Sequence, residues 1–255
     1  SGADLIETNT FGATDVVLGE YDIAGLDYEI SLAAGKLARA AADKISTPDK
    51  PRFVVGAVGP GTKLISLGQI SWKEVEETYF RCFLGLIEAK ADALLLETMQ
   101  DLLLVKAGIV AANRAFAETQ TQLPLFVSVT MEQTGTMLVG SEMSAALNMI
   151  EAFPSVITFG LNCATGPVEM AQHIRYLSQN STRPISVLPN AGLPVMEKGQ
   201  AVYKLGPEEF ANHQANFVKE YGAALVGGCC GTTPEHIAAL SEKIKGATHT
   251  ANAQW

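Results

Sequence analysis

The stretch Val156-Ile157-Thr158-Phe159-Gly160-Leu161-Asn162-Cys163 decides the fold class, because an apolar, β-branched run ends directly in two polar side chains. An apolar run of this length is typical of a strand that helices bury on both faces of a parallel sheet. The same pattern recurs, and it predicts seven strands in all: Asp4–Asn9, Phe53–Gly59, Ala93–Thr98, Leu125–Thr130, Val156–Asn162, Ile185–Ala191 and Ala224–Gly228.

Segments with helical periodicity lie between these runs, so the sequence predicts an α/β protein. An alanine-rich helix is expected over Ile30 to Ile45, and a second over Ser71 to Ala89, where Ser71-Trp72-Lys73-Glu74 forms a capping box. Prolines are expected at the first positions of three later helices: Pro167, Pro207 and Pro234. The stretch Leu193–Gly206 is interpreted as an insertion that follows a strand.

Polar residues end strand after strand, which favours a (β/α)₈ TIM barrel over a doubly wound open sheet. A barrel brings the carboxyl ends of all its strands to one site, whereas an open sheet brings together only those at its switch point. Seven strands instead of eight predict a barrel that lacks one β/α unit. The opening residues, Ser1 to Glu7, have no initiator Met and already resemble a strand, which indicates a fragment. The polar strand ends are Glu7-Thr8-Asn9, Glu97-Thr98, Asn162-Cys163, Asn190 and Cys229-Cys230.

The composition narrows the class of protein. The chain has 255 residues, of which 47% are hydrophobic, and this suits one large domain. A net charge of −9 argues against nucleic-acid binding, which needs a basic surface. No apolar run approaches the roughly 20 residues of a membrane span, and no signal peptide is visible. Four cysteines are too few for a disulfide scaffold, so a reducing, cytoplasmic setting is expected, where cysteines more often serve metals or catalysis.

Three of the four cysteines follow predicted strands. Cys163 follows one strand, and Cys229 and Cys230 follow another, in a turn that Gly227, Gly228 and Gly231 would permit. Three thiolates with an open fourth position are typical of a catalytic zinc site. The alternative, that these are buried small apolar residues, stays open from spacing alone. That alternative is the interpretation chosen for Cys82, which lies on an apolar helix face.

Other polar residues at strand ends are candidates for substrate binding, each with a structural alternative. The Glu97 carboxylate could bind a substrate amine or cap backbone N–H groups. Asn190 could supply an oxygen to a metal or form an Asx turn. Asn9, Thr10 and Asn162 could bind substrate or stabilise loops. All four histidines are interpreted as surface residues, and no P-loop or G-x-S-x-G motif is present.

Four motifs in order resemble the homocysteine-binding domain of zinc-dependent homocysteine S-methyltransferases, from Gly2 to about Lys245. Within that family the chain looks most like the N-terminal module of cobalamin-dependent methionine synthases, and betaine-dependent enzymes look more distant. The motifs are Gly2-Ala3-Asp4-Leu5-Ile6-Glu7-Thr8-Asn9-Thr10-Phe11, Gly160-Leu161-Asn162-Cys163, Pro189-Asn190-Ala191-Gly192-Leu193-Pro194 and Gly227-Gly228-Cys229-Cys230-Gly231-Thr232-Thr233-Pro234.

The resemblance implies a (β/α)₈ barrel whose Zn²⁺ is held by Cys163, Cys229 and Cys230. It implies that Asn190 is a fourth ligand when substrate is absent and that Glu97 holds the substrate amino group. A zinc-bound thiol is deprotonated and becomes a nucleophile at neutral pH. The implied reaction is therefore methylation of homocysteine to methionine, with the three cysteines as the catalytic residues.

The expected methyl donor is methylcobalamin, carried with a folate module by other parts of the parent protein or by a partner chain. The family's first strand and glycine-rich loop lie before residue 1, so residues 1–246 are expected to be an N-terminally truncated homocysteine-binding barrel and 247–255 a tail or linker. Three alternatives remain: a betaine- or S-methylmethionine-dependent enzyme, a barrel whose Gly227-Gly228 rim binds a phosphorylated substrate, and a zinc-binding fragment without activity.

Overall fold

The computed structural model describes residues 1–248 of the chain, so most of the expected tail, 249–255, lies outside the described residues. The chain divides into two compact units, which are described separately. The N-terminal unit comprises Asp4–Val127 and Phe153–Ile157, and the C-terminal unit comprises Ser1–Ala3, Ser128–Ala152 and the described residues from Thr158 on. Within residues 1–248, no helix is both long enough and apolar enough to cross a membrane.

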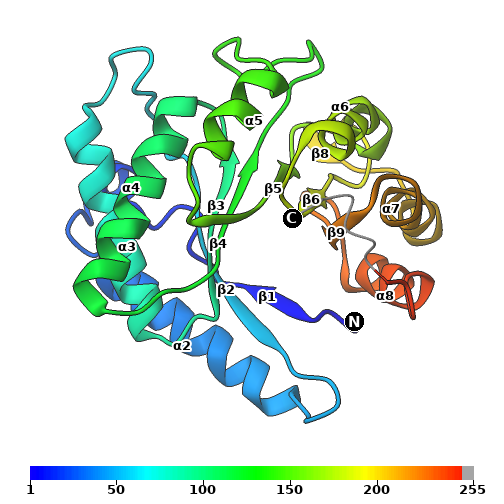
Figure 1. Ribbon diagram of the computed structural model, residues 1–255, viewed down its shortest axis with the longest axis horizontal. Coiled ribbons are helices and arrows are strands. Elements are labelled where there is room, and N and C mark those ends of the chain that lie inside the picture. Colours follow the sequence, from blue (N-terminus) through cyan, green and yellow to red (C-terminus); the bar gives the residue numbers. More distant parts are fainter. Residues whose placement is uncertain (249–255) are drawn as a thin grey trace. The chain divides into compact units, whose positions relative to one another are not determined.

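Parallel strands in the N-terminal unit pair in the order in which the chain forms them. β1 pairs with β2, with Leu5 opposite Phe53, and β2 pairs with β3, with Val55 opposite Ala93. Helices α2, α3 and α4 lie side by side and pack against β2 and β3 (Figure 1). The elements are β1 (Leu5–Glu7), α1 (Asp15–Leu18), the 3₁₀ helix η1 (Gly19–Tyr21), α2 (Asp27–Ile45), β2 (Phe53–Val58), α3 (Trp72–Glu88), β3 (Ala93–Met99), α4 (Leu102–Thr119) and the start of β4 (Leu125–Val129).

The C-terminal unit repeats this arrangement with parallel strands β5, β6 and β9. Phe159 of β5 lies opposite Ile185 of β6, which lies opposite Ala223 of β9. Helices α6, α7 and α8 form the outer layer of this unit, with α6 packed on β6 and α7 on β9 (Figure 1). The elements are α5 (Met143–Glu151), β5 (Val156–Asn162), α6 (Pro167–Asn180), β6 (Ile185–Leu188), β7 (Val195–Glu197), β8 (Gln200–Val202), α7 (Pro207–Tyr221), β9 (Ala223–Val226) and α8 (Pro234–Lys243).

The predicted fold class, an α/β chain of the (β/α)₈ type, is confirmed by this winding. In each unit the neighbouring strands are parallel and follow chain order, and a helix connects each strand to the next apart from the small antiparallel pair of β7 and β8. A doubly wound sheet would instead reverse its strand order at a switch point. The carboxyl ends of neighbouring strands therefore lie side by side within each unit, which is what places the polar strand ends of the sequence together.

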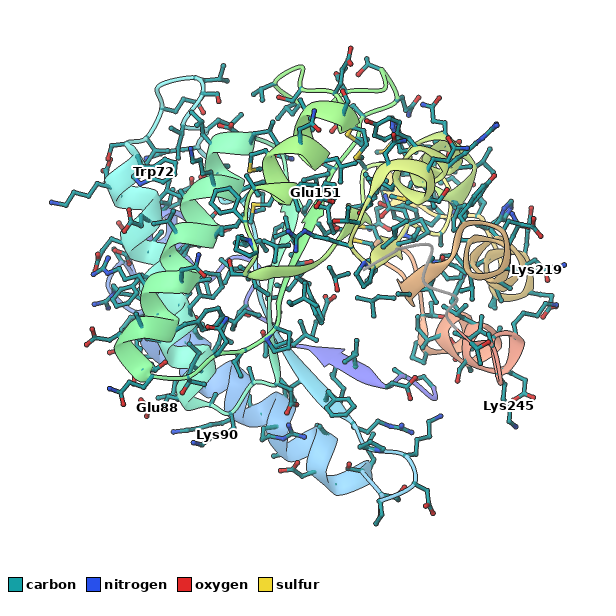
Figure 2. The ribbon with its side chains drawn as sticks, viewed as in Figure 1. Trp72, Glu88, Lys90, Glu151, Lys219 and Lys245 are labelled. Atoms are coloured by element: carbon teal, nitrogen blue, oxygen red, sulfur yellow. The ribbon has the colours of Figure 1, made fainter. Side chains whose placement is uncertain are left out.

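Four of the five predicted helix starts are confirmed, whereas α2 begins at Asp27, three residues before the predicted Ile30. Ser71 caps α3 through a capping box with Glu74, and the helix runs from Trp72 to Glu88, both labelled in Figure 2. A proline occupies the first turn of each of the three later helices for which it was expected: Pro167 in α6, Pro207 in α7 and Pro234 in α8. The missing proline N–H costs nothing there, because a first-turn N–H has no partner within the helix.

The two largest differences in strand length occur at β1 and β6, and one predicted loop contains a hairpin. β1 is confined to Leu5–Glu7 and β6 ends at Leu188, three residues before the predicted end at Ala191. Pro189 has no N–H to continue the ladder, and the residues after it bond to two loops instead of to a strand. The insertion after β6 folds into the antiparallel pair β7 and β8, with Val195 opposite Val202.

Gly160 should not tolerate a side chain. It lies opposite Ser186 across β5 and β6, and a Cβ atom at this position would lie 1.8 Å from the Ser186 carbonyl oxygen. We expect Gly160→Ala to lower the free energy of unfolding by about 2–3 kcal/mol, since backbone cannot relax as a side chain can. Gly19→Ala is the matched control, because Gly19 is exposed and helical with its nearest neighbour at 4.0 Å. Urea unfolding of both variants tests this, and equal midpoints would contradict it.

Candidate metal site

Three thiols from two separate turns meet in the C-terminal unit. The sulfur atoms of Cys163, Cys229 and Cys230 all lie within 4.8 Å of one another. The Sγ–Sγ distance is 3.6 Å between Cys163 and Cys230 and 3.9 Å between Cys229 and Cys230, and all are free thiols. In the part of the chain that the structure describes, this is the one group of three or more His, Cys, Asp or Glu side chains spaced to share a metal ion. The cluster therefore fits a metal site.

The turn that carries Cys163 is conformationally strained. Cys163 and Ala164 both adopt the left-handed region, with φ of 58° and 59°. Such a conformation costs a residue with a side chain about 1–3 kcal/mol and persists only where the surroundings enforce it. The Thr165 N–H donates to the Cys163 carbonyl at 2.7 Å, and the Cys163 N–H donates to the Leu188 carbonyl at 3.1 Å. These bonds hold the Cys163 thiol at the end of β5.

The turn that carries Cys229 and Cys230 depends on the glycines around it. Gly231 has φ of +77°, a conformation that glycine adopts without strain, as the sequence predicts. The Thr232 N–H and hydroxyl both donate to the Cys229 carbonyl, at 3.2 and 2.7 Å. The chain therefore turns sharply enough for two adjacent cysteines to face the same point.

Residues 188–191, which we name the β6 extension, connect the two turns. On the side of β9, the Pro189 carbonyl accepts from the Cys229 N–H at 2.9 Å, and the Ala191 N–H donates to the Cys230 carbonyl at 2.9 Å. On the side of β5, the Asn190 N–H donates to the Thr165 carbonyl at 3.1 Å, in addition to the bond from the Cys163 N–H to Leu188. The spacing of the three sulfurs is thus fixed by backbone hydrogen bonds to one segment.

Asn190 completes this segment with its side chain. It is 3% exposed, and its Oδ1 accepts from the Cys230 N–H at 3.1 Å, while the side chain also bonds to the Cys163 sulfur. The predicted loop-holding role is therefore present, and the role of Asn190 as a metal ligand stays a prediction. Asn162 is buried as well. Its Oδ1 accepts from the Ser128 hydroxyl at 2.7 Å, and its Nδ2 faces the Cys229 sulfur at 3.9 Å.

The three thiols differ in acidity. Hydrogen bonds from the Cys229 thiol, the Ala164 N–H, Cys230 and Asn190 lower the pKa of Cys163 to about 6, against the opposing effect of burial. The pKa of Cys229 is raised, first by its hydrogen bond to Cys163 and then by burial. Burial and the neighbouring Cys163 charge raise the pKa of Cys230. Without a metal, the cluster therefore carries one negative charge at neutral pH, on Cys163.

The predicted substrate-binding residues Asn9, Thr10 and Glu97 belong to the N-terminal unit. Asn9 is exposed and Glu97 is half-buried near the end of β3. Thr10 is 1% exposed and its hydroxyl donates to the Ala57 carbonyl at 2.6 Å, so it stabilises the loop after β1. A substrate contact for these three residues stays a prediction.

Two residues beside the cluster were not identified from the sequence as part of the site. The interpretation of all histidines as surface residues is wrong for His236, which is 6% exposed. Its Nδ1 accepts from the Thr233 N–H at 3.2 Å and its Nε2 donates to the Leu205 carbonyl at 2.8 Å. Its position three residues after a capping threonine is a signal that could have revealed this role. Tyr203, just after β8, hydrogen-bonds to the Cys230 sulfur, and no motif marks it.

Cys82 is fully buried in α3, as predicted, and its thiol faces the Ala13 carbonyl at 3.5 Å. Burial raises its pKa to about 12, so it is chemically inert beside the other three.

The loop after β9 does not favour a phosphate. Its N–H groups would have to point at an anion, but most are already bonded within the unit. The Gly227 N–H donates to the Val187 carbonyl, the Cys229 N–H to the Pro189 carbonyl and the Cys230 N–H to the Asn190 side chain. The Thr232 N–H donates to the Cys229 carbonyl and the Thr233 N–H to the His236 ring. The alternative of a phosphate-binding barrel therefore lacks its anion site at this rim.

A cavity of about 350 Å³ in the C-terminal unit begins beside the Cys163 turn, at Thr165. Carboxylates and amides line much of it, so it suits a ligand with N–H donors better than an anion. Its lining residues are Met131, Glu132, Gln133, Thr165, Val168, Glu169, Gln172, His173 and Leu193.

Comparison with known proteins shows the family to which the chain belongs. Residues 1–244 match the family model of homocysteine S-methyltransferases, and the chain belongs to this family of methyltransferases. It is 48% identical over 244 residues to the methionine synthase of Mycobacterium leprae and 47% identical to that of Mycobacterium tuberculosis. Each alignment covers 96% of this chain and 20% of the relative, so the chain spans about a fifth of the length of these proteins.

Solved structures of the homocysteine methyltransferase MmuM from Escherichia coli share the fold. The oxidised and metallated forms each align with a TM-score of 0.76 at 20% identity, over 95% of this chain and 80% of that chain. The apo form aligns with a TM-score of 0.71 at 21% identity, with the same coverage.

The pKa values of the cysteine thiols predict an order of alkylation that differs from the order of their solvent exposure. In metal-free protein at pH 7, we expect iodoacetamide to alkylate Cys163 about tenfold faster than Cys230, because only a thiol with its pKa near 6 is mostly thiolate there. Cys82 should stay unmodified. Mass spectrometry of the peptides over time measures the order. If the exposed Cys230 reacts first, accessibility rather than ionisation governs the cluster and the account of its charge is wrong.

Proposed function

We propose that this chain is the homocysteine-activating domain of a methionine synthase, with one Zn²⁺ held by Cys163, Cys229 and Cys230. The observation that carries the proposal is the cluster of three thiols on two neighbouring strand-end turns of a homocysteine S-methyltransferase family member. Residues 1–246 would form the domain that receives the substrate.

The spacing of the sulfurs supports zinc. Four ligands at the usual Zn–S distance of about 2.3 Å, in tetrahedral geometry, lie about 3.8 Å apart. The Sγ–Sγ distances from Cys230 to Cys163 and to Cys229, 3.6 and 3.9 Å, bracket that value. Thiolates are soft ligands, which favour zinc over magnesium or calcium. Cys230 is exposed and the other two thiols are half-buried, so the cluster is open to a substrate.

When bound, zinc would keep a coordinated homocysteine thiol deprotonated, and the thiolate is the nucleophile for a methyl group. The three cysteine thiolates would hold the ion. Together with one dication they give the metal centre a formal charge of −1. Asn190 would supply its amide oxygen as the fourth ligand without substrate. That oxygen accepts one hydrogen bond, from Cys230, and an amide oxygen has a second lone pair to offer.

Substrate recognition would involve the other strand ends. The Glu97 carboxylate would pair with the ammonium group of homocysteine, and Asn9, Thr10 and Asn162 would bind its polar groups. Alanine substitution of Glu97 tests this: it should weaken homocysteine binding while the zinc content stays unchanged. Loss of zinc in that variant would show a structural role instead.

The methyl donor would be methylcobalamin, presented by cobalamin and folate modules of the parent protein or of a partner chain. The length of the mycobacterial methionine synthases, of which this chain covers 20%, leaves room for such modules. The donor is tested by supplying methylcobalamin, betaine or S-methylmethionine with homocysteine and measuring methionine. Methionine from betaine alone would overturn this part of the proposal.

Removal of single cysteines tests the zinc site. Protein purified under reducing conditions should contain one zinc per chain by elemental analysis, whereas Cys229→Ser and Cys230→Ser should lose most of it. Cys82→Ala is the matched control and should keep full zinc, since Cys82 is buried in α3.

Wild type and the same cysteine variants are then tested for homocysteine binding by calorimetric titration. Zinc-loaded wild type and Cys82→Ala should release heat on titration with homocysteine, and the two serine variants should not. A wild type without zinc, or a Cys229→Ser variant with full zinc, rejects the site. Zinc without any heat from homocysteine supports a zinc-binding fragment that turns nothing over.

A further inference from the structure

Tyr203 reaches the cysteine cluster from the insertion that follows β6. Its ring lies directly on Gly231: a Cβ atom at Gly231 would lie 2.3 Å from the Tyr203 Cγ. Any side chain at Gly231 would displace the ring. Gly231 therefore has a second role beside its left-handed turn, because it makes room for an aromatic side chain next to the cysteine pair.

The hydroxyl of Tyr203 is a hydrogen-bond partner of the Cys230 sulfur. A tyrosine hydroxyl carries a proton to donate and a thiolate sulfur can only accept, so the hydroxyl is the donor of this bond.

Each sulfur of the cluster thereby has a polar neighbour of its own within residues 1–248. Cys163 has the Ala164 N–H and the Asn190 side chain, and Cys229 has the Asn162 amide at 3.9 Å. Cys230 is the most exposed of the three, and its own N–H is occupied by Asn190. The Tyr203 hydroxyl is the donor that comes from the insertion after the β6 extension.

The position of Tyr203 is fixed by the contacts of the two residues that follow it in the chain. Leu205, two residues later, donates its N–H to the Ala191 carbonyl at 3.1 Å and accepts from the buried His236 Nε2 at 2.8 Å. Lys204 forms an ion pair with Glu197 at the end of β7. These contacts connect the insertion to the β6 extension and to α8, so the ring is held against the cluster.

We propose that Tyr203 is a positioning residue of the sulfur cluster, whose hydroxyl donates a hydrogen bond to the Cys230 sulfur while its ring covers the turn at Gly231. The proposal rests on the proposed zinc function. Hydrogen bonds to a ligating atom tune its charge and orientation, and removing them typically weakens metal binding about 10–100-fold.

Tyr203→Phe keeps the ring and removes the hydroxyl. We expect it to bind Zn²⁺ at least about tenfold more weakly in competition with a chelator. The cobalt-loaded protein gives a second readout, since its sulfur-to-metal charge-transfer absorption should move to longer wavelength when a thiolate loses a hydrogen-bond donor. Tyr221→Phe is the matched control: Tyr221 ends α7 and packs on Phe217, and the variant should match wild type in both readouts.

The outcomes separate the two proposals. If wild type and Tyr221→Phe bind neither zinc nor cobalt, the proposed function fails and this inference with it. If both bind and Tyr203→Phe has the same affinity and absorption, the inference alone is overturned. Equal thermal unfolding of the metal-free proteins shows that the variant is folded, and a weaker site in a folded variant with shifted absorption supports the inference.

Discussion

The hydrogen bonds between the β6 extension and the two cysteine turns are the interaction on which the site depends. Four residues, 188–191, use their backbone groups to hold both turns, and the Asn190 side chain adds a bond to the Cys230 N–H. Both turns contain left-handed backbone, at the non-glycine residues Cys163 and Ala164 in one and at Gly231 in the other. The sulfur spacing thus follows from the way β6 ends.

The fold explains why this arrangement is available. Strands β5, β6 and β9 are parallel neighbours, so their carboxyl ends emerge side by side, with the strand between them able to reach both loops. Pro189 stops the ladder at Leu188 and leaves the next carbonyls and N–H groups for the cysteine turns. Pro189 thus shortens β6 and at the same time leaves backbone groups free to bind the two cysteine turns.

Much of this could be predicted from local patterns. Apolar runs identified the seven parallel strands, and the polar residues at their ends identified all three cysteines and Asn190. Cysteine spacing alone left metal binding undecided, and the family resemblance raised it to a prediction. These features could be predicted because each depends on a few consecutive residues and on the winding of the chain.

What could not be predicted depends on contacts between distant segments. Tyr203 follows the antiparallel pair of β7 and β8, which brings it back to the cluster. His236 is buried where its Nε2 donates to the Leu205 carbonyl and its ring packs on Phe210. The sequence predicts a continued strand over the β6 extension. Pro189 marks where the ladder has to stop, but no local pattern indicates that the next hydrogen bonds go to two loops.

The central claim is that three cysteine sulfurs hold one zinc and leave one position for the substrate thiol. Zinc X-ray absorption of the loaded protein, with and without homocysteine, tests it most directly. The account predicts three sulfur neighbours and one oxygen or nitrogen without substrate, and four sulfurs at about 2.3 Å with it. A sulfur count that homocysteine leaves unchanged would contradict the account.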